Sequence, residues 1–181
     1  MMSELYSNWD NETMEKYINI FQLDIGKKVK ELSTGMRVKL DLLMAMSHNA
    51  EIYILDEPTS GLDPVIRKEL LEILEHLAKD EEKTVIISSH ITSDLEKIAD
   101  RIIYIVSGKI ELDDDIASIR SEYVKVNVTD KNATCDLKGC LKIGDNIITT
   151  REIYENIIDT RNGYYVEPAS LEDVLFYLGG Y

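Results

Sequence analysis

The sequence is short of cysteine, and this shortage limits the metal and redox chemistry that the protein can do. Cys135 and Cys140 are its only cysteines. We interpret them as two reduced thiols of a cytosolic protein, with a local disulfide as the alternative. No zinc site is expected, because no second pair of nitrogen or sulfur ligands stands at a suitable spacing.

Basic residues and long apolar runs are also scarce. The chain carries 20 Lys and Arg against 34 Asp and Glu, a formal net charge of −14. Nucleic acid and anionic lipid both need a positive surface, so neither is expected as a main partner. No apolar run approaches the roughly 20 residues of a membrane-spanning helix. The first residues also lack the pattern of a signal peptide. What is present is enough for a packed core: 44% of the 181 residues are hydrophobic, which suits one domain with or without a small appendage.

The most informative stretch is 51–64. Residues 52–55, Ile-Tyr-Ile-Leu, form a continuous apolar run, which predicts a strand covered on both faces. Asp56 and Glu57 follow directly, before Pro58 breaks the regular structure. The pair is therefore expected at the carboxyl end of a buried strand, where open α/β sheets bind ligands.

Two adjacent carboxylates at that place can serve a metal and a water. One can hold Mg²⁺, directly or through water, because hard cations prefer oxygen ligands. The other can orient and deprotonate an attacking water. The alternative interpretation of Asp56 and Glu57 is a solvated acidic turn after a strand.

A second stretch, Leu32-Ser33-Thr34-Gly35-Met36, opens a helix that is predicted to run to about Ser47. Ser33 or Thr34 can cap this helix, and Gly35 lets the backbone approach a ligand closely. Free N–H groups at a helix start suit a phosphate. The alternative is a capped helix with no ligand.

A third pattern brings a histidine to the same sheet edge. Asp63 can cap a helix that starts at Pro64 and runs to about Asp80, and Lys83–Ser89 is a second apolar strand. A strand, a helix and a strand with a long crossover make a right-handed βαβ unit with parallel strands. His90 then emerges beside Asp56 and Glu57, where it can contact a phosphate or a water, unless its role is structural.

The remaining segments predict packing and carry no further chemical motif. Residues 11–23 have the spacing of an amphipathic helix, and Ser93 with Glu96 suggests a capping box on a short helix. Residues 101–112 predict an antiparallel hairpin, and the acidic run 113–115 a solvated turn. We expect residues 121–181 to form a small α+β appendage with strands at 124–128, 147–150 and 164–166, a turn at 162–163 and a helix over 170–178.

Four of these features stand in a fixed order, namely Leu32–Met36, Ile54–Pro58, Ser60–Asp63 and Ser88–His90. Together they resemble the ABC-type ATPases, in the order signature, Walker B, D-loop and switch histidine. The resemblance covers roughly Glu12 to Leu112. The closing segment 168–174 looks like the tail of bacterial ABC exporter subunits. The signature departs from the commonest form at Thr34 and Met36, where Gly and Gln are usual, and keeps Ser33 and Gly35.

The resemblance implies a fold and a division of the chain. The fold class is α/β, a partial P-loop NTPase (ABC ATPase) core with parallel strands and helices, followed by the small α+β appendage. Residues 1–120 would be the C-terminal part of an ABC ATPase domain and residues 121–181 the appendage. The cofactors would be ATP and Mg²⁺.

The resemblance also implies roles for single residues. Asp56 would hold Mg²⁺, mainly through water. Glu57 would be the general base that polarises the attacking water, and His90 would contact the γ-phosphate. Ser33, Thr34 and Gly35 would close over ATP held by a second cassette. Asp63 would lie at the interface between the two cassettes.

The implied function is that of an ATP-binding and ATP-hydrolysing subunit of a bacterial-type ABC exporter. Its partners would be a second cassette and a separate transmembrane permease, with no nucleic acid. It would be cytoplasmic and peripheral, held at the inner face of the cell membrane through that permease.

The sequence departs from the family because it lacks the phosphate-binding loop. The sequence contains no Gly-x-x-x-x-Gly-Lys-Ser/Thr loop to grip phosphates, and only 31 residues precede Leu32. We therefore expect the C-terminal part of a cassette that alone binds ATP weakly and does not hydrolyse it. We also expect an open sheet edge, which favours dimerisation or aggregation.

Two alternatives stay open. The chain could be a non-catalytic module that supplies only a signature face to an intact cassette. A soluble ABC protein of DNA repair or translation is disfavoured by the acidic balance and by the lack of long coiled-coil arms.

Overall fold

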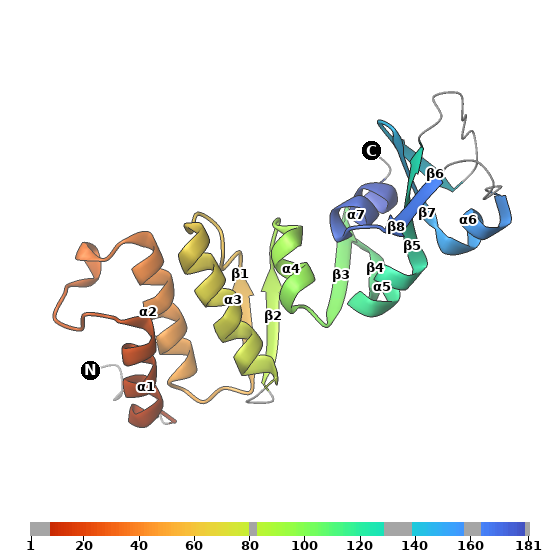
Figure 1. Ribbon diagram of the computed structural model, residues 1–181. Coiled ribbons are helices and arrows are strands. Elements are labelled where there is room, and N and C mark those ends of the chain that lie inside the picture. The colour runs from red at the N-terminus through yellow and green to blue at the C-terminus, as the bar shows by residue number, and fades with distance from the viewer. Residues whose placement is uncertain (1–7, 80–82, 129–138, 158–163, 180–181) are drawn as a thin grey trace. The chain divides into compact units, whose positions relative to one another are not determined.

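The computed structural model describes residues 8–79, 83–128, 139–157 and 164–179 (Figure 1). It divides into two compact units, residues 1–90 and 91–181. The division that the sequence suggests at about residue 120 concerns the extent of the ATPase domain and stays a prediction. In the described part of the chain, no helix is long and apolar enough to cross a membrane.

Unit 1 contains the predicted helices and the βαβ arrangement. Its elements are α1 (Asn11–Phe21), the short 3₁₀-helix η2 (Val29–Glu31), α2 (Thr34–Met46), β1 (Ile52–Asp56), α3 (Pro64–Lys79) and β2 (Thr84–Ser88). Asp10 caps α1, because its carboxylate accepts the N–H of Glu12 at 2.9 Å. The helix ends at Gln22 in a left-handed conformation with φ 52°. Local sequence signals therefore fix both ends of α1.

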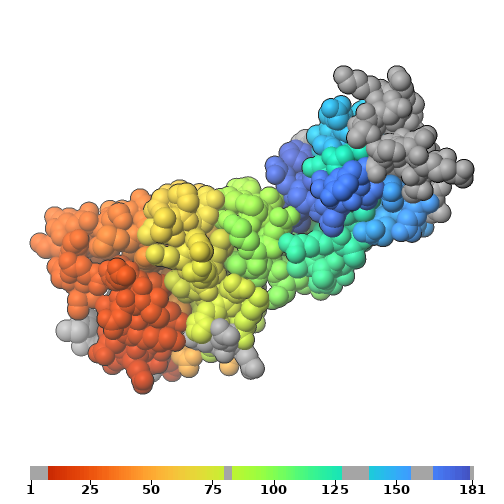
Figure 2. All heavy atoms as spheres, viewed as in Figure 1, coloured from red at the N-terminus to blue at the C-terminus, as the bar shows by residue number. Residues whose placement is uncertain are grey.

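Helices α1 and α2 pack against each other (Figure 2). Their buried contacts come from Tyr17, Phe21, Leu42, Leu43 and Met46, each less than 5% exposed. Strands β1 and β2 pair in parallel, with Tyr53 opposite Val85 and Asp56 opposite Ser88, and α3 makes the crossover between them (Figure 1). This confirms the predicted βαβ unit.

The prediction that the first strand is covered on both faces was wrong for the described part of the chain. Tyr53 is 4% exposed, whereas its neighbours on the opposite face of β1, Ile52 and Ile54, are 58% and 76% exposed. Ile86 pairs with Ile54 in register and is 52% exposed. We call Ile52, Ile54 and Ile86 the isoleucine face. Within the described residues β1 and β2 form a two-stranded sheet, so each also keeps an outer edge. This agrees with the expected open edge.

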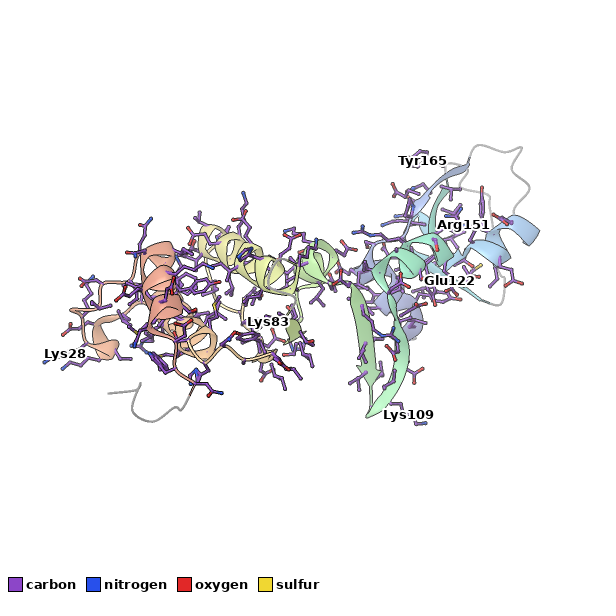
Figure 3. All side chains as sticks on the ribbon, turned by 90° about the horizontal axis from the view of Figure 1, so that it is seen from below. Lys28, Lys83, Lys109, Glu122, Arg151 and Tyr165 are labelled. Carbon is purple, nitrogen blue, oxygen red and sulfur yellow. The ribbon has the colours of Figure 1, made fainter. Side chains whose placement is uncertain are left out.

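Unit 2 begins with a helix and a hairpin. Helix α4 (Thr92–Ile98) precedes β3 (Arg101–Val106) and β4 (Lys109–Asp115), which pair antiparallel as predicted. Lys109 lies at the turn of this hairpin (Figure 3). Ser107 and Gly108 form the turn with φ of 49° and 77°.

The rest of unit 2 is a four-stranded antiparallel sheet with helices. Its elements are α5 (Ile116–Glu122), β5 (Tyr123–Val128), β6 (Cys140–Ile143), β7 (Asn146–Thr150), α6 (Arg151–Ile157), β8 (Tyr164–Pro168) and α7 (Leu171–Gly179). The strand order is β6-β7-β5-β8. Val124, Val126 and Ile148 are fully buried on this sheet, together with Val174 of α7. The predicted α+β character of this region is thus observed.

Two local predictions in unit 2 were wrong. Helix α4 has Ile91 at its N-cap, and this side chain has no hydrogen-bond acceptor. The Glu96 carboxylate does not close a capping box, because it accepts the N–H of Leu171 at the start of α7. The acidic run 113–115 extends β4 and is not a free turn. Arg101 donates from Nε to Asp113 Oδ1 at 2.7 Å across the hairpin, and Asp115 caps α5 through the N–H of Ser118 at 2.8 Å. The turn predicted at 162–163, and Cys135, lie outside the described residues.

Candidate functional site

The acidic pair sits where the βαβ unit places it, at the carboxyl end of β1. Asp56 is the last residue of the strand and lies in register with Ser88, the last residue of β2. The Ser88 hydroxyl donates to Asp56 Oδ1 at 2.5 Å. The parallel pairing thus brings a carboxylate and a hydroxyl from two distant segments to one point of the sheet edge.

Glu57, the residue after β1, has an unusual backbone conformation. Its φ is 46°, in the left-handed region that non-glycine residues rarely adopt. The Glu57 N–H donates to both the hydroxyl and the carbonyl oxygen of Ser88, at 3.0 and 3.2 Å. Ser88 therefore holds both members of the acidic pair, the side chain of one and the backbone of the other.

His90 lies beside the Glu57 carboxylate. Its Nε2 is 3.2 Å from Glu57 Oε1, and its backbone N–H donates to Oε2 at 3.4 Å. The Glu57 side chain is 29% exposed and the His90 ring 95% exposed, so both are open to a ligand or water. A carboxylate that can accept a proton and an imidazole that can donate a hydrogen bond thus lie side by side, and solvent reaches both.

The signature segment caps a helix, as predicted. Ser33 is the N-cap of α2: its hydroxyl accepts the N–H of Met36 at 3.3 Å, and its carbonyl accepts the N–H of Arg37 at 2.9 Å. Ser33 and Thr34 are exposed. A Cβ atom at Gly35 would come within 3.3 Å of Ile66 Cγ2, so this glycine also allows α3 to approach α2.

The D-loop leads into α3. Asp63 caps this helix, because its Oδ1 accepts the N–H groups of Val65 and Ile66 at 3.0 and 3.1 Å. Gly61 has φ 69°, and no atom lies within 4 Å of the Cβ that another residue would add there. Thr59 is 2% exposed, and its hydroxyl has no hydrogen-bond partner in the described part of the chain.

The predicted site residues therefore fall into two groups. Asp56, Glu57 and His90 come together at the sheet edge. Ser33, Thr34 and Gly35 lie at the start of α2 beside the first turn of α3, and no hydrogen bond among the described residues joins them to Asp56 or Glu57. Asp63 belongs to this second group, through Ile66.

The residues at the sheet edge suit Mg²⁺ only in part. Carboxylate and hydroxyl oxygens such as those of Asp56 and Ser88 are suitable ligands for this hard cation. Mg²⁺ also commonly keeps several water ligands. Across the described residues, no group of three or more His, Cys, Asp and Glu side chains could hold a metal ion. A magnesium ion here would therefore take most of its ligands from water and phosphate. Asp56 would contact it mainly through water.

Sequence reasoning did not find the role of Ser88. The signal was present, because Ser88 directly precedes the Ser89-His90 pair at the end of the second strand. Only the register of β1 against β2 shows that its hydroxyl meets the Asp56 carboxylate and the backbone N–H of Glu57.

Sequence comparisons relate the chain to several known proteins. A family model described as "AAA domain, putative AbiEii toxin, Type IV TA system" matches residues 15–93. The chain is 27% identical over 128 residues to the ABC transporter ATP-binding protein YtrB of Bacillus subtilis, with 71% of this chain and 44% of that protein covered. It is 36% identical over 114 residues to the bacitracin transport ATP-binding protein BcrA of Bacillus licheniformis, with 61% and 37% covered.

An archaeal relative matches a longer stretch. The uncharacterized ABC transporter ATP-binding protein MJ1023 of Methanocaldococcus jannaschii is 31% identical over 146 residues, with 81% of this chain and 55% of that protein covered. The chain thus spans 37% to 55% of the length of these three relatives.

Solved structures support the same fold. A dimeric post-hydrolysis state of the ATP-binding cassette MJ0796, bound to ADP and Pi, superposes with a TM-score of 0.52 at 23% identity, with 58% of this chain and 46% of that chain covered. A dimeric structure of MJ0796 described as a bacterial ABC transporter cassette gives the same values, a TM-score of 0.52 at 23% identity, with 58% and 46% covered.

The homologues of this chain are ABC transporter ATP-binding proteins, which confirms the resemblance read from the four motifs. Its fold is α/β and corresponds to part of an ABC ATPase core.

Proposed function

We propose that this chain is the part of an ABC exporter's ATP-binding subunit that carries the signature, the catalytic carboxylate and the switch histidine. In the complete assembly it would couple ATP hydrolysis to transport by a separate membrane subunit. The observation that carries this proposal is the contact of 3.2 Å between Glu57 and His90 at the carboxyl end of β1, beside Asp56.

Each side chain at the sheet edge has a task in this proposal. Glu57 accepts the proton of the attacking water, for which its partly exposed carboxylate is suited. His90 donates to the γ-phosphate from its exposed ring. Asp56, held by the Ser88 hydroxyl, would contact Mg²⁺ through water, and the ion would supply positive charge to the phosphates.

The phosphates need a further polypeptide segment in this proposal. The sequence contains no glycine-rich loop with the Gly-Lys-Ser/Thr ending, so the backbone cradle and the lysine must come from elsewhere in the assembly. We therefore infer that this chain alone binds Mg·ATP weakly and does not hydrolyse it.

The exposure of the signature segment suits contact with a second cassette. Ser33, Thr34 and Asp63 are all exposed, as groups that act on a nucleotide held by another subunit must be. The solved cassette MJ0796 is described as dimeric. We propose that this chain likewise offers its α2 start and its D-loop to a partner cassette.

The α1–α2 pair offers a surface for the membrane subunit, at the inner face of the cell membrane. A cavity of about 380 Å³ with a mainly apolar lining that includes Met14, Leu32 and Leu43 opens between α1, α2 and the connector that joins them. The connector exposes Ile25 and three lysines, one of which is the outward-pointing Lys28 (Figure 3). This combination suits a cytoplasmic segment of the permease that carries apolar and acidic side chains.

The experiment that tests the proposal is calorimetric titration of Mg·ATP. We expect no measurable binding to this chain alone, and binding once a polypeptide that carries the phosphate loop is added. Tight binding to the chain alone would show that other residues grip the phosphates, and the proposed division of labour would then be wrong.

One alternative keeps support from the structure. The signature is exposed and well formed, so the chain could act only as a donor of this face to an intact cassette. In that case the Glu57 carboxylate would be dispensable for ATP turnover, and a Glu57→Gln substitution would leave turnover unchanged.

A further inference from the structure

Two helices that begin at separate motifs touch each other at two successive levels. Helix α2 begins at the signature, and α3 begins directly after Asp63. At the first level Gly35 lies against Ile66: an added Cβ would come within 3.3 Å of Ile66 Cγ2. One turn further along both helices, Lys39 meets Glu69.

The Lys39–Glu69 ion pair differs from the other ion pairs of α3. The Nζ atom of Lys39 is 2.5 Å from Oε2 of Glu69, and the Lys39 and Glu69 side chains are 12% and 46% exposed. Lys68–Glu72, by contrast, joins α3 to itself at 3.6 Å, with side chains 79% and 61% exposed. The shielding of Lys39 and the shorter distance favour the first pair over the second, and the first pair joins two helices.

We propose that Lys39 and Glu69 are positioning residues that fix the signature segment relative to the D-loop. Lys39 lies four residues after Gly35, and Glu69 three residues after Ile66, so both contacts use the same faces of the two helices. The Ile66 N–H is in turn held by Asp63. A continuous path of contacts therefore runs from the signature to the D-loop.

The Gly35–Ile66 contact and the Lys39–Glu69 ion pair constrain the two helices in different ways. The Gly35–Ile66 contact sets how closely the helices approach, because a small residue is needed there. It does not resist sliding along the helix axes. The ion pair supplies this register, because its short distance is kept only when one turn of α2 faces one turn of α3.

The consequence deepens the proposed function and rests on it. If the signature and the D-loop both act on a nucleotide held by a second cassette, they must arrive there together. The Lys39–Glu69 pair makes them one rigid edge, so its loss lowers turnover without touching Asp56, Glu57 or His90.

Amide hydrogen exchange of the full chain tests the positioning role without ATP. The probes are the N–H groups of Met36 and Arg37, which bond to Ser33 at the start of α2. We expect Lys39→Met and Glu69→Gln each to raise exchange at these amides on the order of fivefold, the loss expected for a partly shielded ion pair.

Rescue and a matched control separate positioning from general destabilisation. Lys39→Arg and the charge-swapped variant Lys39→Glu/Glu69→Lys should bring exchange at Met36 and Arg37 back toward the wild-type rate. Lys68→Met removes the same kind of side chain from the exposed pair on α3 and should leave these amides unchanged. Equal exchange in Lys39→Met and Lys68→Met, or no recovery in the swap, would overturn the proposal.

A second measurement connects positioning to turnover. With a cassette that carries the phosphate loop, we expect Lys39→Met to lower the maximal ATPase rate several-fold while the ATP concentration for half-maximal rate stays the same. An unchanged rate alongside raised exchange would overturn the link to turnover. No ATPase activity with the wild-type chain would instead count against the proposed function, and the exchange experiment would still decide the positioning role.

Discussion

Nε2 of His90 lies 3.2 Å from Oε1 of Glu57, so a residue just beyond the end of β2 contacts the side chain of the residue that follows β1. The two residues are 33 positions apart and meet because β1 and β2 are parallel and end at the same edge. Ser88 ties the same two strand ends together through Asp56 and the Glu57 backbone. The proposed catalytic groups are therefore held by the sheet itself.

Replacing the carboxylate tests its proposed role as general base. In an assembly that hydrolyses ATP, we expect Glu57→Gln to lower turnover by about 100-fold or more, because the amide cannot accept the proton of the attacking water. The measurement is steady-state phosphate release. Glu51→Gln makes the same chemical change just before the start of β1, on an exposed residue, and should have no effect. Equal rates for the two variants would favour the signature-donor alternative.

The left-handed backbone of Glu57 predicts that this residue costs stability. Because its φ is 46°, replacement by glycine should relieve steric strain and raise the free energy of unfolding by about 1 kcal/mol. Little is lost with the His90 contact, since that ring is 95% exposed. Urea denaturation provides the measurement. Glu72→Gly, within the regular helix α3, should instead lower stability by about 1 kcal/mol. A lower stability for Glu57→Gly would contradict the argument.

Asp173 predicts an acid-sensitive contribution to the stability of unit 2. Burial raises the pKa of Asp173, but hydrogen bonds from Ser170 and Lys125 outweigh burial and hold the pKa below its usual value of 3.8. The folded state therefore binds the proton less readily than the unfolded state. The stabilisation is complete above the unfolded pKa of about 4 and is lost as the pH falls through the lower folded pKa.

The measurement for this effect compares the wild type with Asp173→Asn across pH, using the NMR signals of Val124 and Val126 to follow unfolding of unit 2. The stability difference between the two proteins should be constant from pH 7 to about pH 5 and should shrink below about pH 4. A difference that stays constant into acid would show that the Asp173 carboxylate does not contribute in this way.

The core of unit 2 predicts a large effect at one isoleucine and a small effect at another. Ile148 on β7 is fully buried, whereas Ile143 on the neighbouring strand β6 is 41% exposed. Ile148→Ala should lower the free energy of unfolding by about 2–5 kcal/mol, because it removes buried apolar contacts and leaves a cavity. Ile143→Ala should cost less than about 1 kcal/mol. Similar losses for both variants would show that Ile148 contributes no more to the core of unit 2 than Ile143 does.

The isoleucine face predicts self-association of the purified chain. Ile54 is 76% exposed on a two-stranded sheet with open edges. Ile54→Thr keeps a β-branched side chain and removes apolar surface, so association measured by sedimentation should fall. Ile20→Thr changes an isoleucine of α1 that is 50% exposed and should leave association unchanged. No difference between the two variants would exclude this face as the contact.

Local signals in the sequence were sufficient to predict much of unit 1. Ser33 and Asp63 are predicted caps that begin two helices, and the apolar periodicity of α1 and α3 supplies the rest. The meeting of His90 with Glu57 followed from the parallel βαβ unit. These predictions succeed because the interactions lie close in sequence or follow from a chirality rule.

The features that were missed depend on partners far along the chain. Glu96 bonds to Leu171 and so does not close a capping box, and Asp113 is drawn into β4 by Arg101. The coverage of β1 could not be predicted either, because a continuous apolar run does not say what lies on each face. The left-handed Glu57 and the Ser88 contacts required the register of two strands.

The isoleucine face has a consequence for the lifetime of the protein in a cell. Chaperones and proteases recognise exposed apolar strands as a mark of an unfinished protein, and Ile52, Ile54 and Ile86 present such a surface on an otherwise folded unit. The cellular amount of this chain should therefore follow the supply of whatever polypeptide covers that surface. Copies in excess of it would be removed, and the stoichiometry of the assembly would be set by degradation as well as by synthesis.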